Sequence, residues 1–212
     1  MKLGGKTYNL NLKLTKHELA IFKKLNTPRK IQDFLERMPI NFDKGADTLM
    51  SPRRLLRVGK AHCIEGALFA AAALWFHGHK PLLLDLQATD DDYDHVVALF
   101  RHNGYWGAIS KTNHAVLRYR EPVYRGIREL ALSYFHEYFD DRGKKNLRNY
   151  SRPFNLARFG TAWVTAEKDL WHIAETLDDS PHSPILTKSM IAGLRRADKT
   201  EIEAGKVVQY KK

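Results

Sequence analysis

The only cysteine of the chain, Cys63, is the residue whose type and position most directly suggest chemistry. It follows a loop at Gly59 and opens an apolar run that extends from Cys63 to Phe76. A thiol in the first turn of a helix faces unpaired backbone N–H groups and the positive end of the helix dipole, and both favour the thiolate. This placement predicts a nucleophile. The alternative is that Cys63 is a small buried apolar residue, which is how a cysteine without a histidine partner usually behaves.

Segments further along the chain continue the pattern in the order helix, strand, strand. The four matching segments are Gly59-Lys60-Ala61-His62-Cys63, His79-Lys80-Pro81-Leu82-Leu83-Leu84, Asp94-His95-Val96-Val97-Ala98-Leu99 and Tyr105-Trp106-Gly107-Ala108-Ile109-Ser110. Over residues 50 to 115 or so, this order resembles the transglutaminase-like branch of the papain-like cysteine enzymes. In that family a cysteine opens a buried helix, a histidine lies on a following strand, and an aspartate lies on the next antiparallel strand. The resemblance implies that Cys63 is the nucleophile and His95 its general base.

The third member of the site departs from the family pattern. Counting on from Trp106, the position of the family's aspartate is occupied by Ser110. A serine can orient a histidine through a hydrogen bond, but it adds no charge to stabilise an imidazolium. Asn113 offers a similar role, because related cysteine proteases orient their histidine with asparagine. The orienting residue is therefore left open between Ser110 and Asn113.

Neighbouring residues are given secondary roles. His62 could assist the oxyanion hole, shape the cleft, or be an ordinary loop histidine, and the backbone N–H of Cys63 is the more direct oxyanion donor. Asp94 precedes His95 on a strand, where successive side chains point to opposite faces, so Asp94 is not expected to orient it. The run Asp90–Asp94 is interpreted as an acidic, solvated loop.

No metal site and no cofactor are expected. The side chains that could form a metal site around the cysteine are those of His62, Cys63, His95 and His114. Zinc sites usually show close ligand pairs such as Cys-x-x-Cys or His-x-x-x-His, and a single cysteine cannot supply such a cysteine pair.

The elements that hold these residues predict an α+β, papain- or transglutaminase-like fold, in which the Cys63 helix is buried against an antiparallel sheet and other helices flank it. Before the core, a strand is expected at Thr7–Leu14 and helices at Lys16–Leu25, at 27–38 and from Ser51. Core strands are expected at Pro81–Ala88, His95–Phe100 and Tyr105–Ser110, the last two joined as a hairpin by Asn103-Gly104. After them, a helix is expected at Glu121–Phe139, an exposed connection at Asp140–Pro153, a helix at Thr165–Leu177 and a loop at Asp178–Pro184.

Composition limits the class of protein. At 212 residues, with 43% hydrophobic and 28% charged residues, the chain suits one domain, with a core over about residues 50–140 and a mostly helical extension over 141–212. A single cysteine excludes an internal disulfide. No signal-like segment opens the chain, and the apolar run Ala67–Phe76 is too short to span a bilayer, so a cytoplasmic protein without membrane contact is expected.

Two functions remain as hypotheses. The first is a cysteine enzyme that cleaves or transfers at an amide bond of a peptide or protein through a Cys63–His95 thioester mechanism, with hydrolysis favoured. The second is an inactive member of the same fold that binds an acidic protein or nucleic acid. A net charge of +11 and the basic residues between Arg142 and Arg152 motivate the second. Whether the chain is an enzyme is therefore left open, as is its oligomeric state.

Overall fold

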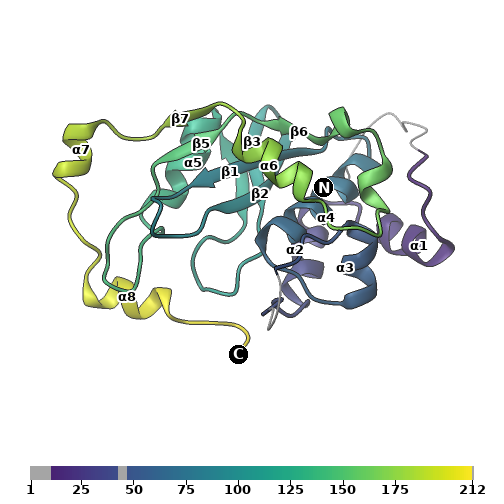
Figure 1. The fold of residues 1–212 in the computed structure, drawn as a ribbon, viewed down its shortest axis with the longest axis horizontal. Helices are drawn as coiled ribbons and strands as arrows, with labels where there is room; N and C mark the ends of the chain where they lie inside the picture. The colour runs from purple at the N-terminus through teal and green to yellow at the C-terminus, as the bar shows by residue number, and fades with distance from the viewer. Residues whose placement is uncertain (1–10, 43–46, 212) are drawn as a thin grey trace.

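The structure, a computed structural model, describes residues 11–42 and 47–211 (Figure 1). Its described strands form one antiparallel sheet in the order β4-β3-β2-β1-β5-β7, with β6 also paired to β1. The strands are β1 (Leu82–Gln87), β2 (His95–His102), β3 (Tyr105–Ile109), β4 (Arg120–Tyr124), β5 (Asn149–Ser151), β6 (Phe154–Asn155) and β7 (His182–Pro184).

Helices cover both faces of this sheet. They are α1 (Lys16–Lys24), α2 (Pro28–Glu36), α3 (Pro52–Val58), α4 (Cys63–Phe76), α5 (Ile127–Phe135), α6 (Trp171–Asp178), α7 (Lys188–Ala192) and α8 (Lys199–Gly205), with short 3-10 turns at Leu156–Phe159 and Ala162–Val164. Helices α7 and α8 lie at the end of the molecule opposite α1 and α3 (Figure 1). Among the described residues, no helix combines the length and the apolar character needed to cross a membrane.

Strand alternation divides the core into two parts. Leu83, Val96 and Ala98 belong to the cluster formed with α1–α4 and α6, whereas Leu84 and Val97 belong to the cluster formed with α5. Successive strand residues point to opposite faces, so the apolar runs of β1 and β2 supply both clusters. Helix α4 is buried from Glu65 to Leu74, as its apolar character on every side predicts.

The central elements match the sequence expectations closely. Helix α4 spans Cys63–Phe76, and β1, β2 and β3 fall within two residues of the predicted bounds. The hairpin between β2 and β3 turns at Asn103 and Gly104, whose φ angles of 49° and 85° are the positive values that these residue types tolerate. The α+β class with an antiparallel sheet is therefore confirmed.

The expectation of one long helix at Glu121–Phe139 is wrong. The chain forms β4 first and starts α5 only after Gly126. Strand β4 pairs with β3 alone at the sheet edge, where Pro122 can be accommodated although it has no N–H to donate. Pairing with β3 therefore outweighs the helical pattern of the local sequence.

The segment after residue 140 also differs from the expectations. The predicted exposed connection at Asp140–Pro153 contains β5 and the buried residues Asn146 and Leu147. The predicted loop at Asp178–Pro184 contains β7, which pairs with β5, so the segment extends the sheet and is not mostly helical. Helix α6 begins at Trp171, later than predicted. Of the strand expected at Thr7–Leu14, residues 7–10 lie outside the described residues and 11–14 are not in a strand.

Candidate functional site

The thiol of Cys63 lies where α4 begins, beside a cleft. Gly59 ends α3 with a φ of 74°, and His62 is the N-cap of α4. Because α4 is buried along its length, the position of Cys63 is fixed relative to the sheet, while Cys63 itself is only partly buried. The cleft is lined by residues from distant parts of the chain, among them His62, Cys63, His95, Tyr138 and Ile202.

His95, the first residue of β2, is oriented by Ser110. The Nε2 atom of His95 lies 2.8 Å from the Ser110 hydroxyl, and both side chains are buried. That hydroxyl donates its proton to the carbonyl of Leu117 over 2.6 Å. A hydroxyl has one proton, so it can only accept from His95, which places a hydrogen on Nε2. Nδ1 is then the ring nitrogen left for the hydrogen bond between His95 and the Cys63 thiol.

Asn113 is not the residue that orients His95. Its Nδ2 atom donates to the carbonyl of Tyr210 over 2.9 Å, and its Oδ1 atom accepts from the N–H of Tyr210 over 2.9 Å. Asn113 borders the cleft, but its amide holds the C-terminal segment. Of the two candidates, the structure brings Ser110 to the histidine.

A buried carboxylate at the start of α4 was missed by the sequence analysis. Glu65 has no exposed surface, and it accepts hydrogen bonds from the Thr48 hydroxyl (2.8 Å), the Met50 N–H (2.9 Å) and the His62 N–H (3.1 Å). The imidazole of His62 lies beside it, with Nε2 3.5 Å from Oε1 of Glu65. A glutamate three residues after an N-cap, in an otherwise apolar helix, is the sequence signal that could have identified this contact.

The histidines control the charge of the thiol. Burial alone would raise the pKa of Cys63, but hydrogen bonds and charge interactions with His62 and His95 outweigh it and lower the pKa to about 5. Burial alone would lower the pKa of His62, but the hydrogen bond to Cys63 and the charge of Glu65 raise it to about 9. The thiolate is therefore the form of Cys63 at neutral pH, as a nucleophile requires.

The end of β3 is held against α4 by a close approach. A Cβ atom added to Gly66 would lie 2.5 Å from Cβ of Lys111, so only glycine fits there without a shift. The buried ammonium of Lys111 donates to the carbonyls of Leu35 and Met38, just where α2 ends, and burial lowers its pKa to about 8. These contacts position the residue next to Ser110.

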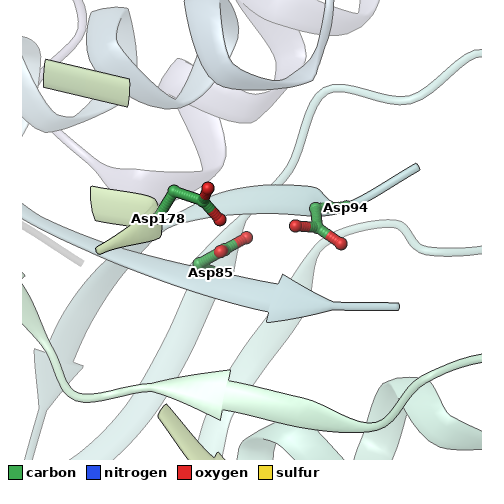
Figure 2. A group of neighbouring side chains, drawn as sticks. All are labelled: Asp85, Asp94 and Asp178. Carbon is green, nitrogen blue, oxygen red and sulfur yellow. The ribbon is translucent and has the colours of Figure 1, made fainter. Parts of the chain in front are cut away.

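Three carboxylates meet on the face of β1 and β2 that α4 and α6 cover. Figure 2 shows Asp85, Asp94 and Asp178 turned toward one another, and one oxygen of each lies within 4.8 Å of the others. Nε2 of His182 donates to Asp85 over 3.1 Å, and Asp94 accepts from the N–H of Ala88 over 2.7 Å. Burial and the neighbouring carboxylates raise the pKa of Asp94 to about 6. Asp94 thus faces α6 and not the imidazole of His95, although the spacing of these oxygens would admit a cation.

Comparison with known proteins adds no family: no family model matches the chain, and no curated protein matches it in sequence. The chemistry of the site is therefore inferred from its own residues and their geometry.

Proposed function

We propose that this chain is a cysteine enzyme with a transglutaminase-like core, which acts on an amide bond of a peptide or protein and releases the product by hydrolysis. The observation that carries the proposal is the meeting of three segments at one cleft. The Cys63 thiol at the start of α4 lines the same cleft as His95 of β2, whose imidazole lowers the pKa of the thiol, and His95 bonds to Ser110 after β3. A thiol whose proton can pass to an oriented imidazole is the arrangement that nucleophilic catalysis requires.

The chemical steps follow from these positions. The Cys63 thiolate attacks the carbonyl carbon and forms a thioester as the amine departs with a proton from an imidazole. The backbone N–H of Cys63 lies in the first turn of α4, where it has no acceptor within the helix, so it is available to the developing oxyanion. Water, activated by an imidazole, then resolves the thioester.

Residue 110 is a serine and not the aspartate of the family pattern, but His95 still has a partner that orients it. The bond from Nε2 to Ser110, continued to the Leu117 carbonyl, fixes one tautomer and one ring plane. Fixing the tautomer is a large part of what an orienting residue contributes in such sites. The charge that the family's aspartate would add has to come from another residue.

Incubating the protein with a library of acylated peptide amides, followed by mass spectrometry, tests the proposal. A covalent acyl adduct on Cys63 and release of a free acid are expected, with neither product from Cys63→Ala. Added primary amine distinguishes the two outcomes of the thioester, because transfer would give a new amide in place of the acid. Intact substrates and an unlabelled Cys63 across the library would contradict the proposal.

The binding-module alternative gains no support from the basic segment that motivated it. Lys144 is paired with Asp91 (2.7 Å), Arg142 with Asp140 (3.0 Å), and Arg148 donates to the carbonyl of Lys145 (2.8 Å). These three side chains therefore bind groups of the same chain. Retention on a polyanion column that disappears with salt would be the result in favour of the alternative.

A further inference from the structure

Each of the imidazoles that bond Cys63 has its Nε2 atom committed elsewhere. Nε2 of His62 lies 2.6 Å from the backbone carbonyl of Thr48. A carbonyl can only accept, so His62 carries a hydrogen on Nε2, as His95 does toward Ser110. Nδ1 is therefore the nitrogen that each ring has left for the Cys63 thiol, on which both imidazoles act, so the thiol proton can move to either one.

The surroundings of the rings differ in charge. Beside His62 lies the buried carboxylate of Glu65, which accepts hydrogen bonds from three donors, the Thr48 hydroxyl and the N–H groups of Met50 and His62. Nε2 of His95 instead meets the Ser110 hydroxyl, which is neutral. An imidazolium is more stable beside a buried negative charge than beside a hydroxyl, because the interior screens the charge poorly.

From this geometry we infer that His62, and not His95, holds the thiol proton in the resting site, so that Cys63, His62 and Glu65 form the charged set and His95 is the mobile base. The catalytic part of this inference rests on the proposed function. It also accounts for Ser110: His95 needs orientation but no negative partner, since the charge that stabilises the imidazolium is supplied by Glu65 from α4 itself.

The inference gives each ring its own proton transfer. As the C–S bond forms and the C–N bond breaks, the Nδ1 proton of His62 passes to the leaving nitrogen. Nδ1 of His95 then takes a proton from water, whose oxygen attacks the thioester carbon and expels the Cys63 thiolate. The proton on His95 finally moves to His62, which restores the starting state, and the net reaction is amide plus water giving acid plus amine.

Titration of the Cys63 thiolate, followed by its ultraviolet absorbance and by the rate of iodoacetamide alkylation, tests this inference without any substrate. In His62→Gln, the midpoint should rise from about 5 by about two to three pH units, toward that of a free thiol. In His95→Gln, the midpoint should stay low, within about one unit of wild type, while thioester hydrolysis is lost. The reverse pattern, with the larger rise in His95→Gln, would overturn the inference.

A second measurement protects the test against variants that fail to fold. Nitrogen-15 NMR of the wild-type histidines at pH 7 reports which ring carries hydrogens on both nitrogens. His62 is expected to be doubly protonated and His95 to carry hydrogen on Nε2 only, and the opposite assignment would refute the inference. Because these readouts need no turnover, a thiolate held by His62 in a protein without amidase activity would contradict the proposed function alone.

Discussion

The side-chain amide of Gln32 forms two hydrogen bonds with the backbone of Ser110. Its Oε1 atom accepts from the Ser110 N–H (2.9 Å), and its Nε2 atom donates to the Ser110 carbonyl (2.8 Å). Ser110 lies just past the end of β3, so a side chain from α2 replaces a neighbouring strand there. Both groups are buried, and this pair of bonds fixes the residue that orients His95.

Replacing Gln32 by Leu should therefore lower both stability and reactivity. Two buried backbone groups of Ser110 would lose their partner, at a cost of about 2–4 kcal/mol in the free energy of unfolding. Urea unfolding measures this cost, and the rate of Cys63 acylation by an activated ester reports the effect on the site. Gln209→Leu is the matched control, since the Gln209 amide donates to the Glu36 carbonyl at an exposed position. Equal losses in the two variants would contradict the role given to Gln32.

Ser110→Ala should slow catalysis but leave the pH midpoint of Cys63 alkylation nearly unchanged. Nε2 of His95 would lose its acceptor and the ring its fixed tautomer, so the hydrolysis of an acylated Cys63 should slow by about tenfold to a hundredfold. The midpoint of Cys63 alkylation should stay near 5, because Glu65 and His62 are unchanged. Ser110→Thr keeps the hydroxyl and should retain more activity than the alanine variant. A large rise in the alkylation midpoint of Ser110→Ala would show that Ser110 stabilises charge.

Gly66→Ala should destabilise the junction of α4 and β3. The added Cβ would lie 2.5 Å from Cβ of Lys111, so the end of β3 or the helix must shift, at a cost of about 1–3 kcal/mol. Gly126→Ala provides the control, because a Cβ at Gly126 meets nothing within 4 Å and its φ is −133°. Thermal unfolding of both variants measures the difference. A Gly66→Ala protein as stable as Gly126→Ala would mean that the two elements adjust without cost.

Asp94→Asn should change how stability depends on pH. The folded-state pKa of Asp94 is about 6, above its value in the unfolded chain, so the folded protein binds more protons between about pH 4 and pH 6. The stability that protonated Asp94 contributes is therefore lost as pH rises through that window. Asparagine does not ionise, so the variant does not suffer this loss. The variant should gain stability relative to wild type between about pH 4.5 and pH 7, on the order of 1 kcal/mol for a partly exposed group. If the difference in unfolding free energy between Asp94→Asn and wild type were the same at about pH 4.5 and at about pH 7, the prediction would be contradicted.

The pH profile of amide hydrolysis should have two limbs. Below about 5 the Cys63 thiolate takes up its proton and activity falls, and above about 9 His62 loses its proton and with it the acid for the leaving nitrogen. Rates measured from about pH 4 to pH 10 on a substrate found by the library experiment would show this bell. A rate that keeps rising above pH 9 would indicate that His62 is not the acid.

Local patterns in the sequence were sufficient for the centre of the fold. The all-round apolar character of Cys63–Phe76, the apolar runs of β1 and β2 and the Asn103-Gly104 turn depend on residues close together in the chain. Each therefore predicts its element with little influence from the rest of the molecule. The same local reading placed Cys63 at a helix start and His95 and Ser110 on neighbouring strands.

Contacts between distant segments decided the other strands of the sheet and the partners of the site residues. Strand β4 forms because β3 offers it an edge, and β5 and β7 form by pairing with each other and with β1, which no local period could indicate. Asn113 holds Tyr210, 97 residues away, and Glu65 meets Thr48, 17 residues away. The sequence alone determined which helix carries the thiol. Only the tertiary structure decided which ring and which carboxylate stabilise its charge, because that depends on burial and on distances across the fold.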